Sequence, residues 1–267
     1  MGNNISPHPI ALITGASSGL GSIFARQLAA QGFGLILVAR RKERLEALAA
    51  DIRARHAVPI EVFPADLSAD PDLERLEQRI GAIESLELLV NNAGFNAPGR
   101  FARVPPERYR QMISVHITAT VRLTHAALPG MLRRHQGGII NVASLAAFFP
   151  LIGSSVYSAT KSALVAFTRV LALELDGSGV QVQVLCPGFF YSEFHETSDY
   201  KGIGRSNLLK LISGAAEPIV TQSLKALRRG QVICIPGWYN KLFSIFGRNH
   251  LFLPIVNTVL KRVLRRR

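Results

Sequence analysis

Residues 10–21 read Ile-Ala-Leu-Ile-Thr-Gly-Ala-Ser-Ser-Gly-Leu-Gly, a short apolar run that leads into a glycine-rich turn. A helical pattern follows over residues 22–30. Glycine lets the backbone turn tightly and approach a ligand, and the unpaired N–H groups at a helix N-terminus attract a pyrophosphate. The strand–turn–helix order therefore predicts a dinucleotide-binding loop, although a turn that only needs glycine would read the same. The residues expected to line the loop are Gly15, Ser17, Ser18, Gly19, Leu20 and Gly21.

A second pattern, Tyr-Ser-Ala-Thr-Lys at residues 157–161, begins 13 positions after Ser144. On a helix, Tyr157 and Lys161 project from the same face about one turn apart. A tyrosine has an unperturbed pKa of about 10, and a nearby ammonium stabilises the phenolate and lowers that pKa. The pair is therefore suited to proton exchange, and a serine hydroxyl alongside can hold a carbonyl or alcohol oxygen. Tyr-x-x-x-Lys alone also occurs by chance on surface helices.

Apolar runs alternate with helical patterns along the chain, without repeats or linkers. This alternation predicts one α/β domain with a doubly wound parallel sheet of about seven strands and helices on both faces. The predicted strands are residues 10–14, 34–39, 59–63, 87–91, 138–143, 180–185 and 231–235. The predicted helices are residues 19–31, 42–56, 70–82, 107–135, 155–176 and 218–229. Such sheets bind ligands outside their C-terminal strand ends, where the glycine loop, Ser144 and Pro187 are expected.

Together these elements resemble the short-chain dehydrogenases/reductases. The resemblance covers about residues 8–190. It rests on motifs in the family's order and spacing: Thr14–Gly21 (TGASSGLG), Asp66-Leu67, Asn91–Gly94 (NNAG), Ser144, Tyr157–Lys161 and Pro187-Gly188. The resemblance implies a Rossmann-type fold and hydride transfer between a nicotinamide and a ketone or secondary alcohol. Within the family, the chain is most similar to NADP-dependent reductases of acyl or steroid-like ketones.

The resemblance also implies a role for each matched residue. Tyr157 would donate its proton to the carbonyl oxygen as hydride leaves the nicotinamide. Lys161 would bind the nicotinamide ribose and lower the tyrosine pKa, while Ser144 would hold the substrate oxygen. Pro187-Gly188 would end a strand beside the nicotinamide, and Ser192 replaces the threonine usual a few residues later.

One position departs from the family pattern. The fourth catalytic residue of the family is an asparagine in the long middle helix, and His116 occupies that place here. An imidazole can also bind water, or relay a proton near neutral pH. The alternatives are a structural histidine, or a bulky substitution that weakens or abolishes turnover.

The end of the second predicted strand bears on the choice of cofactor. An NAD enzyme of this fold usually places a carboxylate there, whereas the 2′-phosphate of NADP needs a cation. The sequence continues Arg40-Arg41-Lys42, so we expect NADP(H), with Arg40 as the first phosphate partner and Arg41 as the second. A basic first turn of a solvated helix is the alternative. The resemblance implies that Asp66 bonds the adenine, unless it caps the next helix, and that Asn92 is partly structural. No metal site is expected.

Composition is typical of a globular protein: 48% of the 267 residues are hydrophobic and 18% are charged. The two cysteines, Cys186 and Cys234, are too few for a disulfide framework and indicate a reducing compartment. The first residues show no signal-peptide pattern, and no apolar run reaches the 18 residues of a spanning helix. We therefore expect a cytoplasmic protein, with peripheral contact to the inner face of a membrane as an option.

Positive charge is concentrated near the C-terminus, since residues 201–267 hold 13 Lys and Arg and one acidic residue, Glu217. Residues 255–267 add apolar side chains at helical spacing. Such a segment is typical of contact with an anionic membrane surface, although its apolar face can instead pack on the core. Nucleic acid is not expected as a partner, because the segment lacks a known motif and stacking aromatics.

Substrate choice is expected to lie in residues 191–230, the part that varies most in the family. Apolar side chains there and just before it predict a lid over a hydrophobic ketone, with simple packing as the alternative. Residues 231–267 would add the last strand and the basic C-terminal segment. Analogy alone suggests a homodimer or homotetramer. The rival functions are a nucleotide-binding protein that has lost turnover and a membrane-associated scaffold.

Overall fold

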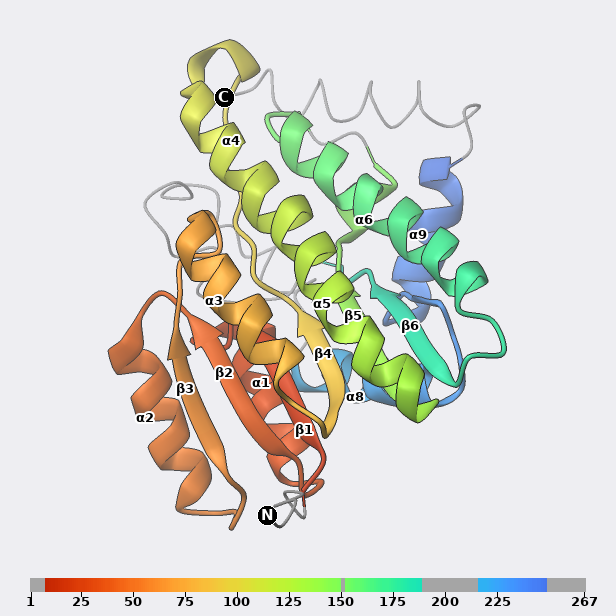
Figure 1. The fold of residues 1–267 in the computed structure, drawn as a ribbon. Helices are drawn as coiled ribbons and strands as arrows, with labels where there is room; N and C mark the ends of the chain where they lie inside the picture. Colours follow the sequence, from red (N-terminus) through yellow and green to blue (C-terminus); the bar gives the residue numbers. More distant parts are fainter. Residues whose placement is uncertain (1–7, 150–151, 189–215, 249–267) are drawn as a thin grey trace.

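Seven parallel strands form a single sheet in the order β3-β2-β1-β4-β5-β6-β7 (Figure 1). The structure is a computed structural model that describes residues 8–149, 152–188 and 216–248. The strands are β1 Ile10–Thr14, β2 Gly34–Ala39, β3 Ile60–Pro64, β4 Leu86–Asn91, β5 Gly137–Val142, β6 Val180–Leu185 and β7 Ile233–Cys234. The order reverses at β1, which pairs with β2 on one side and β4 on the other. The crevice beyond the carboxyl ends of β1 and β4 is therefore the place where this fold binds ligands.

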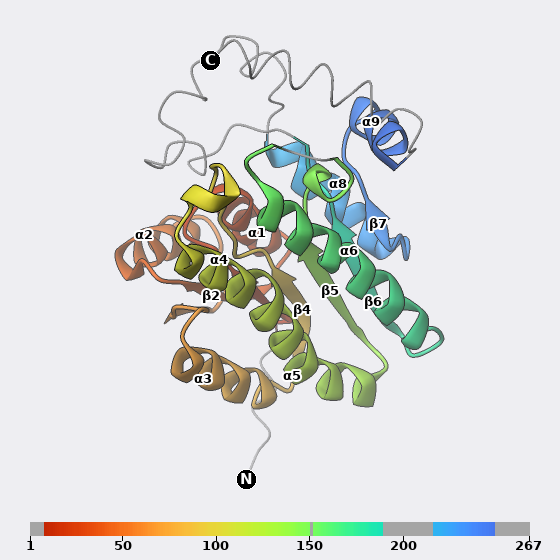
Figure 2. The same cartoon turned by 90° about the horizontal axis from the view of Figure 1, so that it is seen from above.

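Helices cover both faces of the sheet, as Figure 2 shows from above. Side chains of α1, α2 and α8 pack into the hydrophobic core on one face, and those of α3, α5 and α6 into the core on the other. The helices are α1 Gly19–Ala29, α2 Lys42–Arg53, α3 Asp70–Gly81, α4 Pro106–Ile113, α5 Ala119–Arg134, α6 Ser155–Glu174, α8 Ala216–Arg228 and α9 Trp238–Arg248. The doubly wound α/β fold predicted from the sequence is confirmed.

The strand β1 shows why its residues form a central strand. Ala11 and Ile13 point into the core beneath α1, whereas Leu12 points into the core beneath α3 and α5. All three side chains are fully buried, as expected when successive side chains point to opposite faces of a covered sheet. Burying one Leu or Ile side chain contributes about 1.5–3 kcal/mol to folding. This strand therefore anchors the glycine turn that follows it.

The long middle helix predicted over residues 107–135 contains a change of helix type. Between α4 and α5 lies a π-helical turn, Ser114–Thr118, with His116 at its centre. A π-turn holds one more residue than an α-turn and turns a side chain out of its α-helical row, and such turns are frequent at functional sites. The imidazole of His116 is fully buried there.

The C-terminal third differs most from the sequence-based prediction. The seventh strand comprises only Ile233–Cys234 instead of residues 231–235. The last part of the predicted lid forms α8, whose apolar face packs in the core with α1. Helix α9 was not predicted, and its position beside the sheet is seen in Figure 1. The rest of the predicted lid up to residue 215, Ser192 and the C-terminal segment 255–267 lie outside the described residues. No described helix is both long and apolar enough to cross a bilayer.

Candidate active site

The turn after β1 has a backbone that requires glycine. Gly15 and Gly19 have φ angles of +67° and +56°, in the left-handed region that other residues seldom adopt. A Cβ atom at Gly21 would lie 2.3 Å from the carbonyl oxygen of Gly15. The turn thus passes directly into the N-terminus of α1, the arrangement that binds pyrophosphate. The side chain of Leu20 is buried in the core, so only its backbone can face a ligand.

Thr14 and Asn92 fasten this turn to the end of β4. The hydroxyl of Thr14 accepts hydrogen bonds from the N–H groups of Asn92 (2.9 Å) and Ala93 (3.0 Å). The amide of Asn92 donates to the carbonyl oxygens of Thr14 (2.8 Å) and Gly15 (3.2 Å). Asn92 therefore holds the shape of the turn, which fits the partly structural role expected of it. Thr14 was not identified as a site residue, and its place at the start of TGASSGLG was the only signal.

Two arginines follow β2 at the same edge of the sheet. The guanidinium of Arg41 donates to the hydroxyls of Ser17 (3.1 Å) and Ser18 (3.3 Å), so it lies against the glycine turn. Arg40 is exposed and precedes it directly. A guanidinium offers a planar fork of donors that matches a phosphate. The two predicted phosphate partners are therefore next to the predicted pyrophosphate loop.

Asp66 lies across from these arginines, in the loop after β3. Its carboxylate accepts hydrogen bonds from the N–H group and the hydroxyl of Ser68, at 2.9 and 2.7 Å. Burial raises the pKa of this carboxyl, but the two bonds from Ser68 and the charge of Arg40 outweigh it and hold the pKa below its usual value. Asp66 is thus ionised and fixed at the crevice, and it does not cap α3, which begins after Ala69.

Lys161 is a buried cation in the second turn of α6. Its side chain is 4% exposed, and its ammonium donates to the carbonyl oxygen of Val142, the last residue of β5, at 2.8 Å. Burial lowers the pKa of Lys161 to about 8. The ammonium nitrogen lies 5.7 Å from the centre of the Tyr157 ring, one turn earlier on the same helix face. This places a positive charge close to a phenol at the carboxyl end of the sheet.

Ser144 lies directly beyond β5 and begins a short 3-10 helix, Leu145–Ala147. Its hydroxyl accepts a hydrogen bond from the N–H of Ala146 at 3.1 Å. The N–H of Leu145 donates to the carbonyl oxygen of Pro187 at 2.9 Å, which ties this turn to the end of β6. The hydroxyl of Ser162 in α6 donates to the carbonyl of Ala147 at 2.9 Å. Ser144 is thus held between the loop after β6, which carries Pro187, and the helix that carries Tyr157.

Helix α9 packs closely against Gly188, in the loop after β6. A Cβ atom at Gly188 would lie 2.4 Å from the side-chain oxygen of Asn240, which is itself buried in the first turn of α9. The rings of Phe149 and Phe243 meet edge to face with centroids 6.2 Å apart. Glycine at 188 therefore permits the close approach of α9. Asn240 was missed at the sequence level, because nothing in its surroundings resembles a motif.

His116 is fully buried, in contact with the ring of Tyr157 and close to the ammonium of Lys161. Its Nε2 atom accepts from the N–H of Phe95 at 3.1 Å, and its Nδ1 atom lies 2.9 Å from the hydroxyl of Thr160. The His116 and Tyr157 rings meet edge to face with centroids 5.7 Å apart. Burial, and then the nearby ammonium of Lys161, hold the pKa of His116 well below its usual value.

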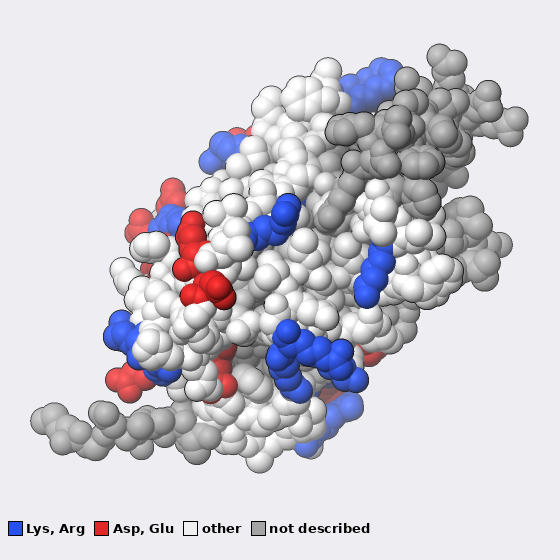
Figure 3. Space-filling view, turned by 90° about the vertical axis from the view of Figure 1, so that its right-hand side faces the viewer, with Lys and Arg blue, Asp and Glu red and all other residues white. Residues whose placement is uncertain are grey.

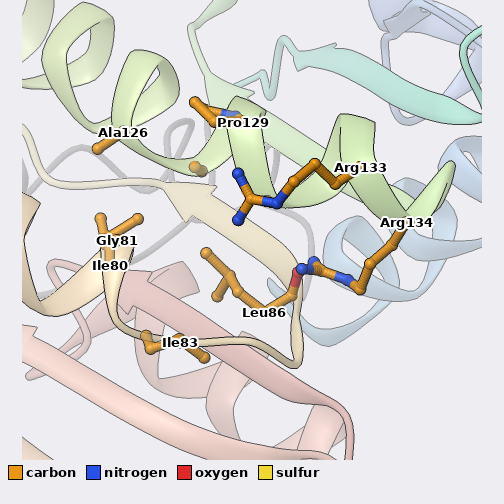
Figure 4. A pocket seen from close by; sticks show the side chains of 10 residues that line it. Ile80, Gly81, Ile83, Leu86, Ala126, Pro129, Arg133 and Arg134 are labelled. Carbon is orange, nitrogen blue, oxygen red and sulfur yellow. The ribbon is translucent and has the colours of Figure 1, made fainter.

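The residues predicted from the sequence thus gather at the carboxyl edge of the sheet. A small hollow of about 150 Å³ (Figure 4) lies at the opposite edge, where α3 and α5 end and β4 begins. Arg134 reaches across its rim to the carbonyl oxygen of Leu86 at 2.6 Å. The hollow is therefore unrelated to this site. Within the described ranges no cluster of His, Cys, Asp and Glu could hold a metal ion.

Comparison with known proteins agrees with this architecture. The family profile described as short chain dehydrogenase matches residues 9–202. The chain belongs to the short-chain dehydrogenases. Members of this family are oxidoreductases.

Among similar proteins, a short-chain dehydrogenase from Sphingobium yanoikuyae, solved in complex with NADPH, is 33% identical, with a TM-score of 0.81 over 86% of this chain and 89% of that one. A bulky-bulky ketone specific alcohol dehydrogenase from Comamonas testosteroni is 30% identical, with a TM-score of 0.77 over 88% and 90%. A very-long-chain 3-oxoacyl-CoA reductase from Pyrenophora tritici-repentis is 36% identical over 65% of this chain and 52% of its own length. Another protein of the same fold, from Burkholderia phymatum, holds NAD.

Proposed function

We propose that this protein is an NADP(H)-dependent oxidoreductase that interconverts a bulky hydrophobic ketone and its secondary alcohol. The observation that carries the proposal is the buried ammonium of Lys161, one helical turn from Tyr157 at the carboxyl edge of the sheet, in a chain that belongs to the short-chain dehydrogenases. A buried lysine without a function would only destabilise the fold, because removing a charge from water without a counter-ion costs free energy.

Each of three side chains has its own role in the proposed hydride transfer. The nicotinamide, when bound, supplies or accepts the hydride. Tyr157 donates a proton to the carbonyl oxygen in reduction and removes it in oxidation. The ammonium of Lys161 stabilises the phenolate that remains and binds the nicotinamide ribose. Ser144 donates its hydroxyl proton to the substrate oxygen and stabilises the charge that develops there.

The glycine turn fits a dinucleotide closely. The backbones of Gly15 and Gly21 are in contact, and a side chain at either position would meet protein atoms below 3.0 Å. This turn therefore has the compact form that lets a pyrophosphate approach the N-terminus of α1. Arg40 and Arg41 would bind the 2′-phosphate, and Asp66 would accept from the adenine amino group.

The choice of NADP over NAD is tested by the ratio of the two dissociation constants. Replacing Arg40 and Arg41 by alanine should weaken NADPH binding by about 10- to 100-fold, as expected for two charge-assisted bonds, and leave NADH binding within about threefold. Arg55→Ala, just beyond the C-terminal end of α2, is the control, and it should change neither constant. An unchanged NADPH/NADH ratio in the double variant would refute this cofactor assignment.

The substrate class is supported by the aromatic pair Phe149 and Phe243 beside the site, and by the ketone and 3-oxoacyl substrates named for two similar proteins. We expect NADPH consumption with medium- or long-chain 3-oxoacyl compounds, steroid-like ketones or other ketones with two large substituents. Good turnover of a small polar carbonyl alone would contradict this. Tyr157→Phe should abolish the rate in either case.

A rival function, NADPH binding without turnover, is motivated by His116 at the position of the family's asparagine. The two functions predict the same cofactor binding and differ in catalysis. If the wild type is inert with every carbonyl and His116→Asn gains activity, the binding-only function is correct. If the wild type turns over and Tyr157→Phe does not, the enzyme assignment stands.

A membrane surface is proposed as a partner of α9 and the basic residues that follow it. Large apolar side chains project from α9 into solvent, with Trp238 77% and Ile245 64% exposed. The 13 basic residues among 201–267 complement an anionic bilayer. Figure 3 shows the adjoining side of the molecule, where broad uncharged areas separate scattered charges.

Trp238 is the only tryptophan of the chain, so its emission reports directly on this contact. Vesicles with phosphatidylserine should shift the emission to shorter wavelength and sediment the protein, and Leu242→Glu with Ile245→Glu should prevent both. Ala47→Glu with Ala50→Glu places the same charges at the same spacing on the exposed face of α2 and should change nothing. Equal sedimentation of both double variants would disprove the contact.

A homo-oligomer is proposed through the outer faces of α5 and α6. Both expose apolar side chains, among them Val121 on α5 and Val170 and Leu173 on α6, the last 77% exposed. Light scattering should give at least twice the 29.1 kDa chain mass. Val170→Asp with Leu173→Asp should reduce it to the single-chain mass, and a wild type that is already monomeric would refute the interface.

A further inference from the structure

His116 joins two parts of the site that lie far apart in the sequence. The loop after β4 contacts it through Phe95, and the first turns of α6 contact it through Thr160. The π-helical turn carries the imidazole between them, because the extra residue displaces His116 from the α-helical row. The side chain of Asn96 also joins these two segments, since its amide donates to the hydroxyl of Ser154, the residue before α6, at 3.1 Å.

The hydrogen bonds fix the tautomer of this histidine. The hydroxyl of Thr160 has one proton, and it donates that proton to the carbonyl oxygen of Tyr157 at 2.8 Å. The hydroxyl oxygen must therefore accept from His116, so Nδ1 carries a proton. The N–H of Phe95 points at Nε2, which must therefore be unprotonated. The ring is a neutral imidazole with its proton on Nδ1.

Protonation of this ring would break the arrangement. A proton on Nε2 would face the N–H of Phe95, donor against donor. Among the described residues, the other titratable groups that face the ring are Lys161 and Tyr157, both from α6, and the ammonium of Lys161 opposes a second positive charge beside it. Space is also short, since a Cβ atom at Gly94 would lie 2.8 Å from Nε2 and 3.5 Å from the Lys161 ammonium.

We propose that His116 is a positioning residue that holds the first turns of α6 against the loop after β4, as a neutral Nδ1-protonated imidazole that never carries the transferred proton. This role rests on the function proposed above, and it differs from a proton relay, which would require the imidazolium. The chain of bonds runs from the Phe95 N–H through His116 and Thr160 to the backbone of Tyr157. It sets where the phenol and the ammonium lie relative to the cofactor crevice.

Three substitutions separate the contributions of the two bonds. His116→Asn reaches only as far as Nδ1 and can keep the bond to Thr160. His116→Gln reaches further and can keep the bond from Phe95. His116→Phe keeps the ring volume and loses both. We expect kcat to fall by about 10- to 100-fold in the phenylalanine variant and less in the other two, because a small misplacement of catalytic groups is enough for such a loss. His125→Gln, on the exposed face of α5, is the matched control.

The deciding measurement is independent of turnover. In protein labelled with nitrogen-15 in histidine, the His116 signals, identified by their loss in His116→Gln, should show a protonated Nδ1 and a bare Nε2 from pH 6 to 9. In protein labelled with carbon-13 at the tyrosine ring, the Tyr157 signal should move in His116→Phe and stay in His125→Gln. An Nε2 proton, titration of His116 in this range, or an unmoved Tyr157 signal would overturn the proposal. An inert wild type with the expected spectra would instead refute only the proposed function.

Discussion

Replacing Lys161 by methionine should stabilise the unliganded protein at neutral pH, although it removes activity. Methionine has nearly the length of lysine and suits the apolar surroundings of a side chain that is 4% exposed. Burial lowers the pKa of Lys161 from 10.5 to about 8, which corresponds to about 3 kcal/mol of unfavourable free energy for the charged form. The lost hydrogen bond to Val142 offsets about 1–2 kcal/mol of this. The net gain for Lys161→Met at pH 7 should therefore be about 1–2 kcal/mol.

The gain should depend on pH in a direction set by the lowered pKa. Below pH 8 the lysine is charged in both the folded and the unfolded protein, so the wild type bears the full penalty. Between about 8 and 10.5 the folded protein has lost this proton while the unfolded protein keeps it, and the free energy of unfolding of the wild type rises with pH. The advantage of the methionine variant should shrink over that window and reverse within it, because the rise of about 3 kcal/mol in the wild type exceeds the gain of about 1–2 kcal/mol.

The assay is urea unfolding of cofactor-free protein at pH 7, 9 and 10.5. Wild type and variant are both compared in a Tyr157→Phe background, so that titration of this phenol does not contribute. A variant that is less stable at pH 7, or a stability difference that does not change with pH, would contradict the burial of a charged lysine.

Three further outcomes are expected. Gly21→Ala should weaken NADPH binding at least tenfold, because the added Cβ would lie 2.3 Å from the carbonyl oxygen of Gly15. Gly81→Ala is the control, since a Cβ there would meet open space, and it should leave NADPH binding unchanged. Isothermal titration calorimetry measures both dissociation constants. Arg122→Met should lower the free energy of unfolding by about 1 kcal/mol, because the guanidinium of Arg122 in α5 forms ion pairs with Glu77 and Asp70 of α3. This loss of stability should be smaller in high salt, which screens the ion pairs. Thr14→Val should lower stability by about 1–3 kcal/mol, because it leaves the N–H groups of residues 92 and 93 without their acceptor, and chemical unfolding measures this loss.

The parts of the fold that were predictable are those encoded locally. The strand–turn–helix at residues 10–29 was predicted within two residues, because its apolar run, its glycines and its helical spacing all lie within one short stretch. Tyr157 and Lys161 were placed on one helix face by their spacing alone, and α6 confirms that they share it.

The surroundings of His116 could not be predicted, because its partners come from distant parts of the chain. Phe95 lies 21 residues before it and Thr160 lies 44 residues after it. Neither residue is unusual in its own stretch of sequence, and the π-turn that brings the ring between them has no clear sequence signal. The histidine itself was noticeable only as a departure from the family pattern.

Helix α9 was missed although its apolar residues recur at helical spacing. Its exposed face carries Trp238, Leu242 and Ile245, whereas two polar residues, Asn240 and Ser244, face the protein. The apolar face of α9 is thus turned to solvent, and hydrophobic periodicity alone does not tell which face of a helix is buried. The strand before it was predicted over residues 231–235, but only Ile233–Cys234 pair with β6.

Transfer of deuteride from labelled cofactor tests the central claim most directly. NADPH carrying deuterium at C4 of the nicotinamide is incubated with the wild type and a bulky hydrophobic ketone, and the alcohol is analysed by mass spectrometry. The account predicts deuterium on the carbinol carbon with the wild type and no alcohol with Tyr157→Phe. An alcohol without deuterium, or equal product from the phenylalanine variant, would contradict it.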